Sequence, residues 1–427
     1  MRHTGKRAFV SLSVPNFRLY FAGQSISMVG SWMQSVAQSW LVLQLSGSGT
    51  ILGLVVAAQF LPVLLAGPYG GLVADRTNKR RLLLVTQSML ANLALVLGLL
   101  TVVHLVRLWM VVVFAVLFGV VNAVGNPTRQ TFVPKVVGAE LLRNAVSLNS
   151  VMTNAARAIG PAVAGILIAA VGVGVCFLAN AASFVAVLFA LALMRTETLQ
   201  QVSPVMRQAG QLREGLRYIR SQPGLWIPLM MMALVGTLAY EFPVVLPLLA
   251  QTGMGGDART YGFLTSAMGC GAILGGLGIA VGGRAGVIPL LVTACGFGAA
   301  LLAAAVVGPL PAELIALGFV GVGSTAFLAT GNTTLQLVTE PHFRGRVMAL
   351  WSVTFLGSTP VGGPIIGAVA EHLGPRAGLA VGGAACLAAA ILGIPALRRI
   401  PPDERVLREQ IIASPPHPHP VTESDRA

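Results

Sequence analysis

The sequence predicts an all-α integral membrane protein with twelve transmembrane helices arranged as two six-helix halves. Three observations predict this fold class. The chain is 55% hydrophobic and 10% charged over 427 residues, it contains apolar runs long enough to cross a bilayer, and its basic residues gather in alternate loops. Because soluble domains carry about 25% charged residues, this composition indicates a chain whose solvent is lipid.

A spanning helix needs about 20 mainly apolar residues. Twelve runs meet this requirement, at approximately 17–45, 50–74, 82–106, 108–125, 144–171, 173–194, 225–250, 260–281, 287–307, 313–338, 347–372 and 377–397. We therefore predict an N-terminal half at 1–195, a cytoplasmic linker at 196–224, a C-terminal half at 225–400 and a disordered tail at 401–427. Within the linker, Leu212, Leu216 and Ile219 recur at helical spacing, which predicts an amphipathic helix on the membrane surface.

The charged loop from Gly71 to Arg81 fixes the predicted orientation. It lies between the second and third runs and holds one carboxylate, Asp75, among four basic side chains. With the N-terminus inside, 24 of the 28 Lys and Arg residues fall on the cytoplasmic side, three fall outside, and Arg157 lies in the membrane. The net charge of +14 therefore reflects the concentration of basic residues in the cytoplasmic loops. This distribution excludes the nucleic-acid-binding function that the total charge alone would suggest. We expect a plasma (inner) membrane protein with both termini cytoplasmic.

The two halves resemble each other in sequence. Gly125-Asn126 followed by Gln130 is matched by Gly331-Asn332 followed by Gln336, and Gly160-Pro161 is matched by Gly363-Pro364. The similar order and interval predict a duplication of six helices in parallel orientation, with a site at the interface between the halves.

A polar stripe runs along the first predicted helix. Gln24, Ser27, Ser31, Gln34 and Gln38 follow one another at spacings of three and four residues, which places them on one face over about four turns. We interpret this face as a wall of a polar cavity at the interface between the halves, the path that a transported molecule would take if the protein moves a substrate across the membrane. The alternative is hydrogen bonding between helices, worth about 0.6–2 kcal/mol per contact.

The fifth helix carries a similar stripe of Asn149, Thr153 and Arg157. A charge near mid-span costs about 2.5–3.5 kcal/mol even on lenient scales, so Arg157 should meet a carboxylate, backbone carbonyls or a substrate anion. The alternative is a structural role in bracing a bend at Gly160-Pro161. Further candidates for the cavity are Asn122 and Asn126 in the fourth helix and Thr325, Asn332 and Gln336 in the tenth.

Glu241 is the acidic residue set well inside an apolar run. It lies beside Tyr240 and close to Thr237, and Pro243 and Pro247 should loosen the helix after it. Burial favours the neutral form of a carboxyl group, so such a residue can take up and release protons. We hypothesise that Glu241 carries a coupling proton and that Arg157 modulates it. The alternative is a structural carboxyl group, bonded to Tyr240 or exposed near the outer surface.

The sequence contains no catalytic set, metal cluster or ATP-binding signature, and its four cysteines lie in apolar runs. We therefore expect no enzymatic activity and no cofactor, with a proton gradient as the energy source. The expected partners are a small-molecule substrate and the lipid bilayer, and the expected state is a monomer.

The charged loop resembles a known signature. Gly71-x-Val73-x-Asp75-Arg76-x-Asn78-Lys79-Arg80 is similar to the motif that follows the second helix of the major facilitator superfamily. Val73 and Asn78 depart from that motif. Asn78 stands where the family has a glycine, and asparagine tolerates the left-handed backbone that a glycine would supply, so we expect the turn to survive. Three other stretches resemble a branch that includes the enterobactin exporter and the macrolide efflux proteins: Asn16-Phe17-Arg18-Leu19-Tyr20, Arg157-x-x-Gly160-Pro161 and Arg344-Gly345-Arg346-Val347.

The resemblance implies a secondary transporter that works by alternating access and exports a small amphipathic compound, such as a drug or siderophore, in exchange for protons. It also places the charged loop near the start of the eleventh helix. We predict a conformational latch there in the outward-open state, in which Asp75 meets the helix N-terminus. The residues of this latch are Gly71, Asp75, Arg76, Lys79, Arg80, Arg344 and Arg346.

Two other functions remain open. One is uptake of a metabolite by the same fold, and the other is a lipid flippase or membrane-embedded enzyme. The drug-antiporter branch often has an arginine within its fourth helix, whereas Arg129 is expected to follow the end of that helix here, which is a departure from proton antiport by that route.

Overall fold

The computed structural model describes residues 9–195, 218–220, 222–340 and 342–399. Over these residues the chain is helical, with no strand. The N-terminal half contains η1 (Val10–Ser13), α2 (Pro15–Ser46), α3 (Gly49–Arg76), α4 (Lys79–Val102), α5 (Leu108–Val171) and α6 (Val173–Leu193). The C-terminal half contains α8 (Pro223–Ala239), α9 (Phe242–Leu248), η3 (Leu249–Gly253), α10 (Ala258–Gly282), α11 (Val287–Val306), α12 (Leu310–Val338), α13 (Arg344–His372) and α14 (Pro375–Arg399).

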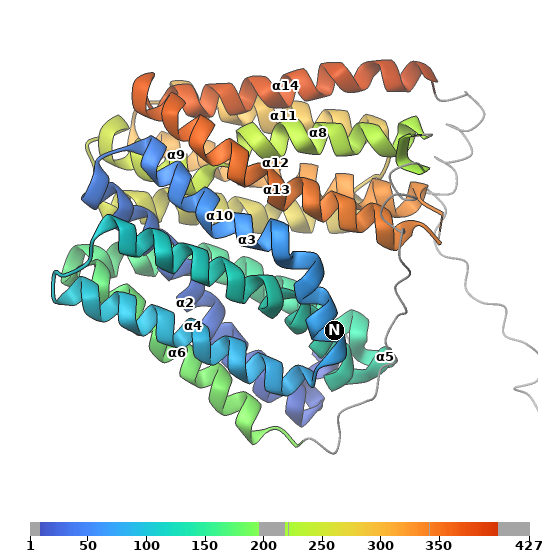
Figure 1. The fold of residues 1–427 in the computed structure, drawn as a ribbon. Coiled ribbons are helices and arrows are strands. Elements are labelled where there is room, and N and C mark those ends of the chain that lie inside the picture. Colours follow the sequence, from blue (N-terminus) through green and yellow to red (C-terminus); the bar gives the residue numbers. More distant parts are fainter. Residues whose placement is uncertain (1–8, 196–217, 221, 341, 400–427) are drawn as a thin grey trace, which may run out of the picture.

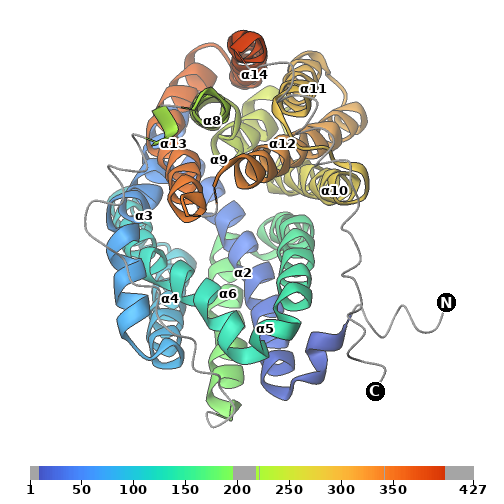
Figure 2. The same ribbon diagram turned by 90° about the vertical axis from the view of Figure 1, so that its right-hand side faces the viewer.

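These helices form two bundles, α2–α6 and α8–α14, that lie side by side (Figures 1 and 2). Of the described helices, ten spans are long and apolar enough to cross a membrane. The protein is therefore a multi-pass membrane protein. Most of the predicted linker helix and the whole predicted tail lie outside the described residues.

Three predicted spans are not among the ten as separate helices, so the count of twelve stays a prediction. The first, α2, falls outside the ten because its polar stripe lowers its hydropathy. The fourth and fifth merge into the 64 residues of α5, where Gly138 alone has non-helical angles, with φ of 76°. A glycine adopts this left-handed conformation without a Cβ clash, so the chain turns there while helical hydrogen bonding resumes on both sides.

The placement of Arg129 after a helix end was wrong. The helix continues past Gly125 and through Pro127, so Arg129 lies within α5 and donates a hydrogen bond to the side chain of Asn126.

The helix that carries Glu241 is interrupted as its prolines predict. α8 ends at Ala239 and α9 begins at Phe242, which leaves Tyr240 and Glu241 between two helical segments. Pro243 has no N–H and disfavours helical angles in the residue before it, so a break just ahead of it is expected. The backbone carbonyl of Glu241 then accepts the N–H groups of Val244 and Val245, both at 3.0 Å, which starts α9.

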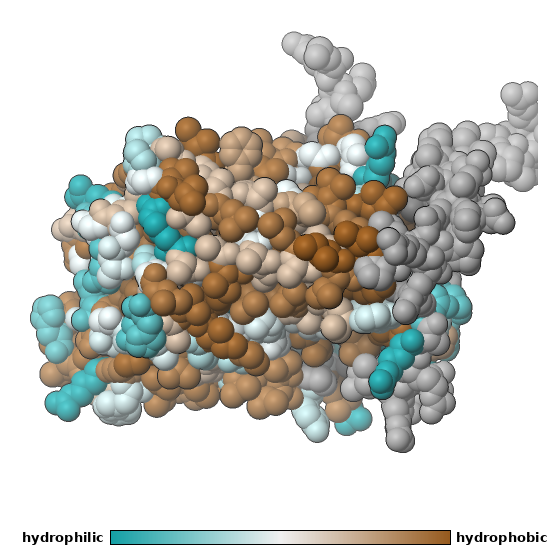
Figure 3. All heavy atoms as spheres, turned by 90° about the horizontal axis from the view of Figure 1, so that it is seen from above, coloured by the Kyte–Doolittle hydropathy of each residue, from teal (hydrophilic) through white to brown (hydrophobic). Residues whose placement is uncertain are grey.

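The outer flank of the bundles is apolar. Figure 3 shows hydrophobic residues over the side of the molecule and hydrophilic residues toward its two ends. Large side chains such as Leu65, Phe189 and Leu274, each 65% exposed, lie on this flank. A soluble monomer would not leave so much apolar surface in water, whereas in a bilayer it faces lipid.

Candidate transport site between the two halves

The halves meet at two helix crossings, and glycines make both possible. At the first, α3 packs on α13: a Cβ at Gly53 would clash with the carbonyl oxygen of Gly363, and one at Gly49 would lie 2.7 Å from that of Gly367. This crossing lies toward the end of the molecule where α3 begins and α13 ends. We call it the Glu371 end, after a residue in the last turn of α13, and we call the opposite end the Asp75 end.

The second crossing joins α5 to α10 and lies toward the same end. A Cβ at Gly262 would lie 2.5 Å from the carbonyl oxygen of Pro161, and one at Gly269 would lie 2.8 Å from that of Arg157. Backbones that approach this closely leave no room for side chains. Arg157 therefore extends from the point where the two halves touch.

The guanidinium of Arg157 lies over the ring of Trp32 in α2, with Cζ 5.4 Å from the ring centroid. Gly160 sets this contact, because a Cβ there would lie 2.7 Å from that of Trp32. In the C-terminal half, the ring of Tyr240 meets Phe297 and Phe355 edge-on at 5.3 and 5.4 Å. The structure thus places the Arg157 guanidinium on an aromatic ring of α2, and a separate aromatic cluster lies in the opposite half.

Glu241 lies behind the first crossing. It is 2% exposed, and a Cβ at Gly362 of α13 would lie 2.8 Å from its Oε1. Both carboxylate oxygens are buried without a hydrogen bond of standard geometry to the described residues, and the hydroxyl of Thr359 faces them. The Tyr240 hydroxyl donates to the carbonyl of Ser324 at 2.6 Å instead, so neither form of the structural alternative for Glu241 is observed.

The stripe on α2 is buried. Gln34 accepts a hydrogen bond from Asn180 of α6 at 2.6 Å, and Gln38 donates to Gln59 of α3 at 2.8 Å. Gln24 and Ser27 are 2% and 1% exposed. The half-buried Ser31 donates to the carbonyl of Ser27 at 2.8 Å. In this conformation, Gln34 and Gln38 form hydrogen bonds to neighbouring helices. The interpretation of the stripe as a cavity wall stays a prediction.

The remaining predicted cavity residues are mostly half-buried. Thr153 and Thr237 donate to backbone carbonyls one turn earlier, at 2.9 and 2.6 Å. Asn122 likewise donates to the carbonyl of Phe118 at 2.9 Å. Asn332 accepts a hydrogen bond from Gln336, its partner in the duplicated pattern, whereas Asn126 accepts one from Arg129, the residue before Gln130. Asn149, Asn332 and Thr325 are half-buried, whereas Gln336 is exposed.

A groove of about 360 Å³ opens between α3, α8 and α13. Its lining includes Leu64 from the N-terminal half and the hydroxyl-bearing Thr237, Thr354 and Ser358 from the C-terminal half. Thr237 lies one helical turn before Glu241, and Ser358 lies one turn before Gly362, which packs on that carboxylate, so the groove lies close to Glu241.

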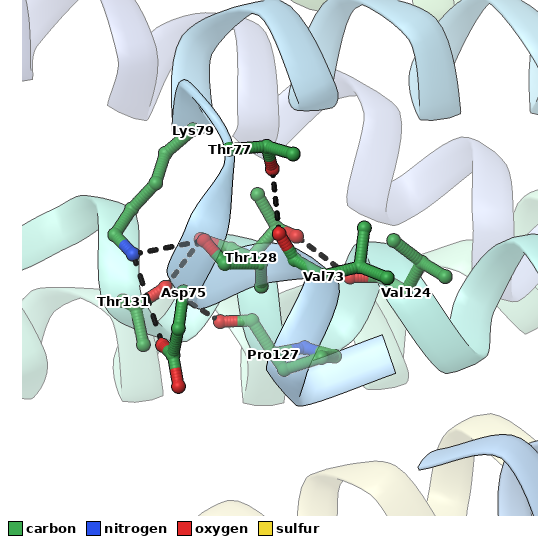
Figure 4. Close-up of polar contacts among 9 residues, drawn as sticks. Val73, Asp75, Thr77, Lys79, Val124, Pro127, Thr128 and Thr131 are labelled. Carbon is green, nitrogen blue, oxygen red and sulfur yellow. Dashed lines mark hydrogen bonds and ion pairs between the residues drawn. The ribbon is translucent and has the colours of Figure 1, made fainter. Parts of the chain in front are cut away.

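At the Asp75 end, the charged loop is closed on itself. Asp75 pairs with Lys79 at 4.0 Å, and the Lys79 ammonium also donates to the carbonyl of Ala74 (Figure 4). Arg80 donates to the carbonyls of Leu191 and Ala192 at 2.7 and 2.9 Å, which caps the C-terminus of α6. Gly71 is buried and Arg76 exposed.

Asn78 makes the expected turn between α3 and α4 without adopting a left-handed backbone. Its φ is −65°, and its side chain accepts the N–H groups of Arg80 and Arg81 at 3.1 and 3.2 Å. Asparagine therefore serves as the N-cap of α4 and does not replace the conformational freedom of glycine. On the facing helix, Arg344 is exposed and Arg346 lies over the ring of Phe343 at 5.0 Å. The latch concerns another conformation and stays a prediction.

Sequence reasoning missed a contact at the Glu371 end. The carboxylate of Glu371 accepts hydrogen bonds from the Ser48 hydroxyl at 2.7 Å and from the Thr50 N–H at 2.8 Å. Glu371 belongs to the C-terminal half and Thr50 to the first turn of α3, so this is a helix cap supplied across the interface. A carboxylate near a helix end gives no signal in the sequence of such a distant partner.

Two bundles that meet at one end, with charged and polar groups buried between them, define a secondary transporter of the major facilitator type. The sequence model of the family described as transmembrane secretion effector matches residues 6–423. The chain belongs to this family, and the resemblance to the major facilitator superfamily is confirmed. Family and fold are those of transporters and not of enzymes.

Relatives of known name support the predicted branch. The chain is 32% identical to the staphyloferrin A transporter of Staphylococcus aureus over 41% of its own length and 45% of the relative's. It is 28% identical to the multidrug efflux pump Tap of Mycolicibacterium fortuitum, over 82% and 87% of the two chains. It is 25% identical to the enterobactin exporter EntS of Shigella boydii, over 88% and 91%.

Solved structures share the fold. A bacterial homologue of the lysosomal transporter Spinster, described as inward-facing and unoccupied, superimposes with a TM-score of 0.66 at 15% identity, over 93% of this chain and 97% of the other. A bacterial homologue of the iron transporter ferroportin, described as inward-facing, gives a TM-score of 0.69 at 16% identity, over 90% and 98%.

Proposed function

We propose that this protein exports a small amphipathic compound across the plasma (inner) membrane by alternating access, in exchange for protons. The observation that carries the proposal is the pair of glycine crossings, which close the interface toward the Glu371 end. Arg157 and Glu241 lie at these crossings, where a change in the packing of the halves would change their surroundings. The names of the relatives, which include an enterobactin exporter and a multidrug efflux pump, support export of this class of cargo.

The proposed orientation puts the Asp75 end in the cytoplasm, with both chain termini. The excess of Lys and Arg in the loops of that end supports it. In this orientation the crossings close the outer side, and the conformation is open to the inside, ready to receive cargo. The protein works as a monomer, because each half supplies one wall of the site.

A compound-accumulation screen tests the direction and the cargo. Cells that lack the gene and cells that overexpress it are loaded with macrolides, ferric-siderophore precursors and cationic dyes. Export predicts lower accumulation on overexpression and higher accumulation on deletion. The reverse pattern would establish uptake, and movement of a headgroup-labelled lipid in proteoliposomes without movement of these compounds would establish a flippase.

The coupling role of Glu241 is tested in sealed vesicles under an imposed pH gradient. Glu241→Gln removes the titratable oxygen and keeps the shape, so we expect loss of gradient-driven transport while exchange of cargo down its own gradient persists. Glu140→Gln, which alters an exposed carboxylate, is the matched control and should transport normally. Gradient-driven transport by Glu241→Gln at the wild-type rate would rule out this role.

A further inference from the structure

The surroundings of Arg157 point to the chemical class of the cargo, and this inference rests on the proposed transport function. An arginine side chain keeps its positive charge at all accessible pH values. A buried charge without a partner of opposite sign costs several kcal/mol, so buried arginines are normally paired. The question is therefore which group supplies the negative charge for Arg157.

The described part of the chain does not supply it. Ion pairs between described residues join Lys79 to Asp75 and Arg376 to Glu313, and neither of them includes Arg157. Arg157 is half-buried as a residue, and its Nε is fully buried with no hydrogen-bond acceptor among the described residues. Trp32 offers the face of its ring, which attracts a cation but does not replace an oxygen acceptor for the N–H groups. Glu241 lies at the other crossing, against Gly362 of α13.

The position of Arg157 suits a ligand. Its backbone carbonyl touches α10 at Gly269, so its side chain begins at the contact between halves. Trp32 comes from the same half, and Tyr240, Phe297 and Phe355 form an aromatic cluster in the opposite half. A molecule between the halves would meet a guanidinium flanked by aromatic rings. Guanidinium donors match the geometry of a carboxylate, and aromatic walls match a flat apolar body.

We propose that the cargo is an organic anion with an aromatic or apolar body, whose carboxylate or similar acidic group pairs with Arg157 while its body packs against Trp32 and Tyr240. The acidic group of the ligand then supplies the negative charge that the described residues do not place beside Arg157. Trp32 positions the guanidinium and gives the body of the cargo a surface to stack on.

The test uses two probes of equal shape, 2-naphthoate and its uncharged amide, 2-naphthamide, with the full-length protein in lipid nanodiscs. Equilibrium dialysis measures both affinities. We expect the wild-type protein to bind the carboxylate roughly ten- to a hundredfold more tightly than the amide, as for a hydrogen bond between charged groups. Arg157→Gln should reduce this ratio to about one, Arg157→Lys should keep part of it, and Trp32→Leu should weaken both probes together.

Arg129→Gln is the matched control, because Arg129 lies in the same helix and already donates to Asn126. It should keep the wild-type ratio. Equal binding of the two probes to the wild-type protein, or a ratio unchanged in a folded Arg157→Gln variant, would overturn the proposal. Neither result would contradict the proposed export, because the compound-accumulation screen in cells tests export separately. Retention of the ratio by Arg157→Lys excludes misfolding as the cause of its loss in Arg157→Gln.

Discussion

The two crossings between the halves have the same backbone packing and opposite chemistry. In both, a glycine of one helix lies on a carbonyl oxygen of the other, as Gly53 on Gly363 and Gly262 on Pro161. The α3–α13 crossing has two carboxylates beside it, Glu241 inside the bundle and Glu371 at the end. The α5–α10 crossing has a cation, Arg157.

The two crossings also differ in how the N-termini of α3 and α10, the equivalent helices of the two halves, are capped. The N-terminus of α10 is capped from within its own loop, by Asp257 accepting from Arg259 and Thr260 at 2.9 and 3.2 Å. The N-terminus of α3 receives Glu371 from the other half. Duplication would give both crossings the same shape, and the ionisable groups make them different. Steric changes should therefore affect the crossings alike, and changes of charge should affect one of them.

The largest expected effect is steric. Gly53→Ala and Gly262→Ala each place a Cβ against a carbonyl of the other half, and overpacking costs about 1–3 kcal/mol. That cost falls on the closed state, so the equilibrium should shift about five- to 150-fold toward separation at the Glu371 end. Electron–electron distance measurements between labels at Leu45 and Leu373, both exposed, would detect the shift.

Gly67→Ala is the matched control, because no atom lies within 4 Å of the Cβ it would add. Alanine improves helix propensity at all three sites, so the control separates that gain from the clash. If only one of the two crossing variants separates the halves, the crossings are not mechanically equivalent and the comparison fails.

A smaller effect is expected from the cap across the interface. Glu371→Gln removes the charge that faces the N-terminus of α3, where a carboxylate contributes about 0.3–1 kcal/mol. We expect the open population at the Glu371 end to rise about two- to fivefold in the same distance measurement. Asp257→Asn should leave the separation of the halves unchanged, because that cap lies within one half. An equal response to both substitutions would mean that the cap supplied by Glu371 across the interface does not hold the halves together.

The smallest effect in the present conformation is expected from Asp75→Asn. Asp75 is paired within its own loop here, so neither distance at the Glu371 end nor fold stability should change much. In the outward-open state the predicted latch would lose about 0.3–1 kcal/mol. A distance measurement across the Asp75 end, with cargo present, would show fewer closed molecules. An unchanged equilibrium would remove the latch and leave the topology intact.

Much of the fold follows from the sequence because lipid imposes strong rules. Apolar runs and Pro243 predicted most of the spans and the break at Glu241, and the orientation inferred from the basic loops stays a prediction. The predicted helix boundaries were wrong where a helix continues past the end of its apolar run. This happens in α5, which runs through Pro127 and resumes after Gly138. The turn at Asn78 was expected but its conformation was not, because an asparagine can cap a helix as well as adopt a left-handed conformation.

The site was predictable in residue type and not in pairing. Intramembrane charges are rare, so Arg157 and Glu241 stood out at once. Their neighbours did not, since Trp32 is 125 positions from Arg157 and a lone tryptophan in an apolar run carries no signal. The α2 stripe shows the same limit, because a glutamine that faces a cavity and one that faces Asn180 have the same spacing.

The cap by Glu371 has a consequence for how the two conformations are balanced. Glu371 and Asp75 lie in the last turns of α13 and α3, where the negative end of each helix dipole disfavours a carboxylate. These helices of 29 and 28 residues run antiparallel, and each is about 42 Å long. In the structure Glu371 reaches the positive end of its neighbour, and in the predicted latch Asp75 would do the same at the far end. A change between the two conformations would then replace one favourable carboxylate contact with a similar one at the other end. The free-energy difference between the conformations would stay small, so a small driving force would suffice to shift the equilibrium.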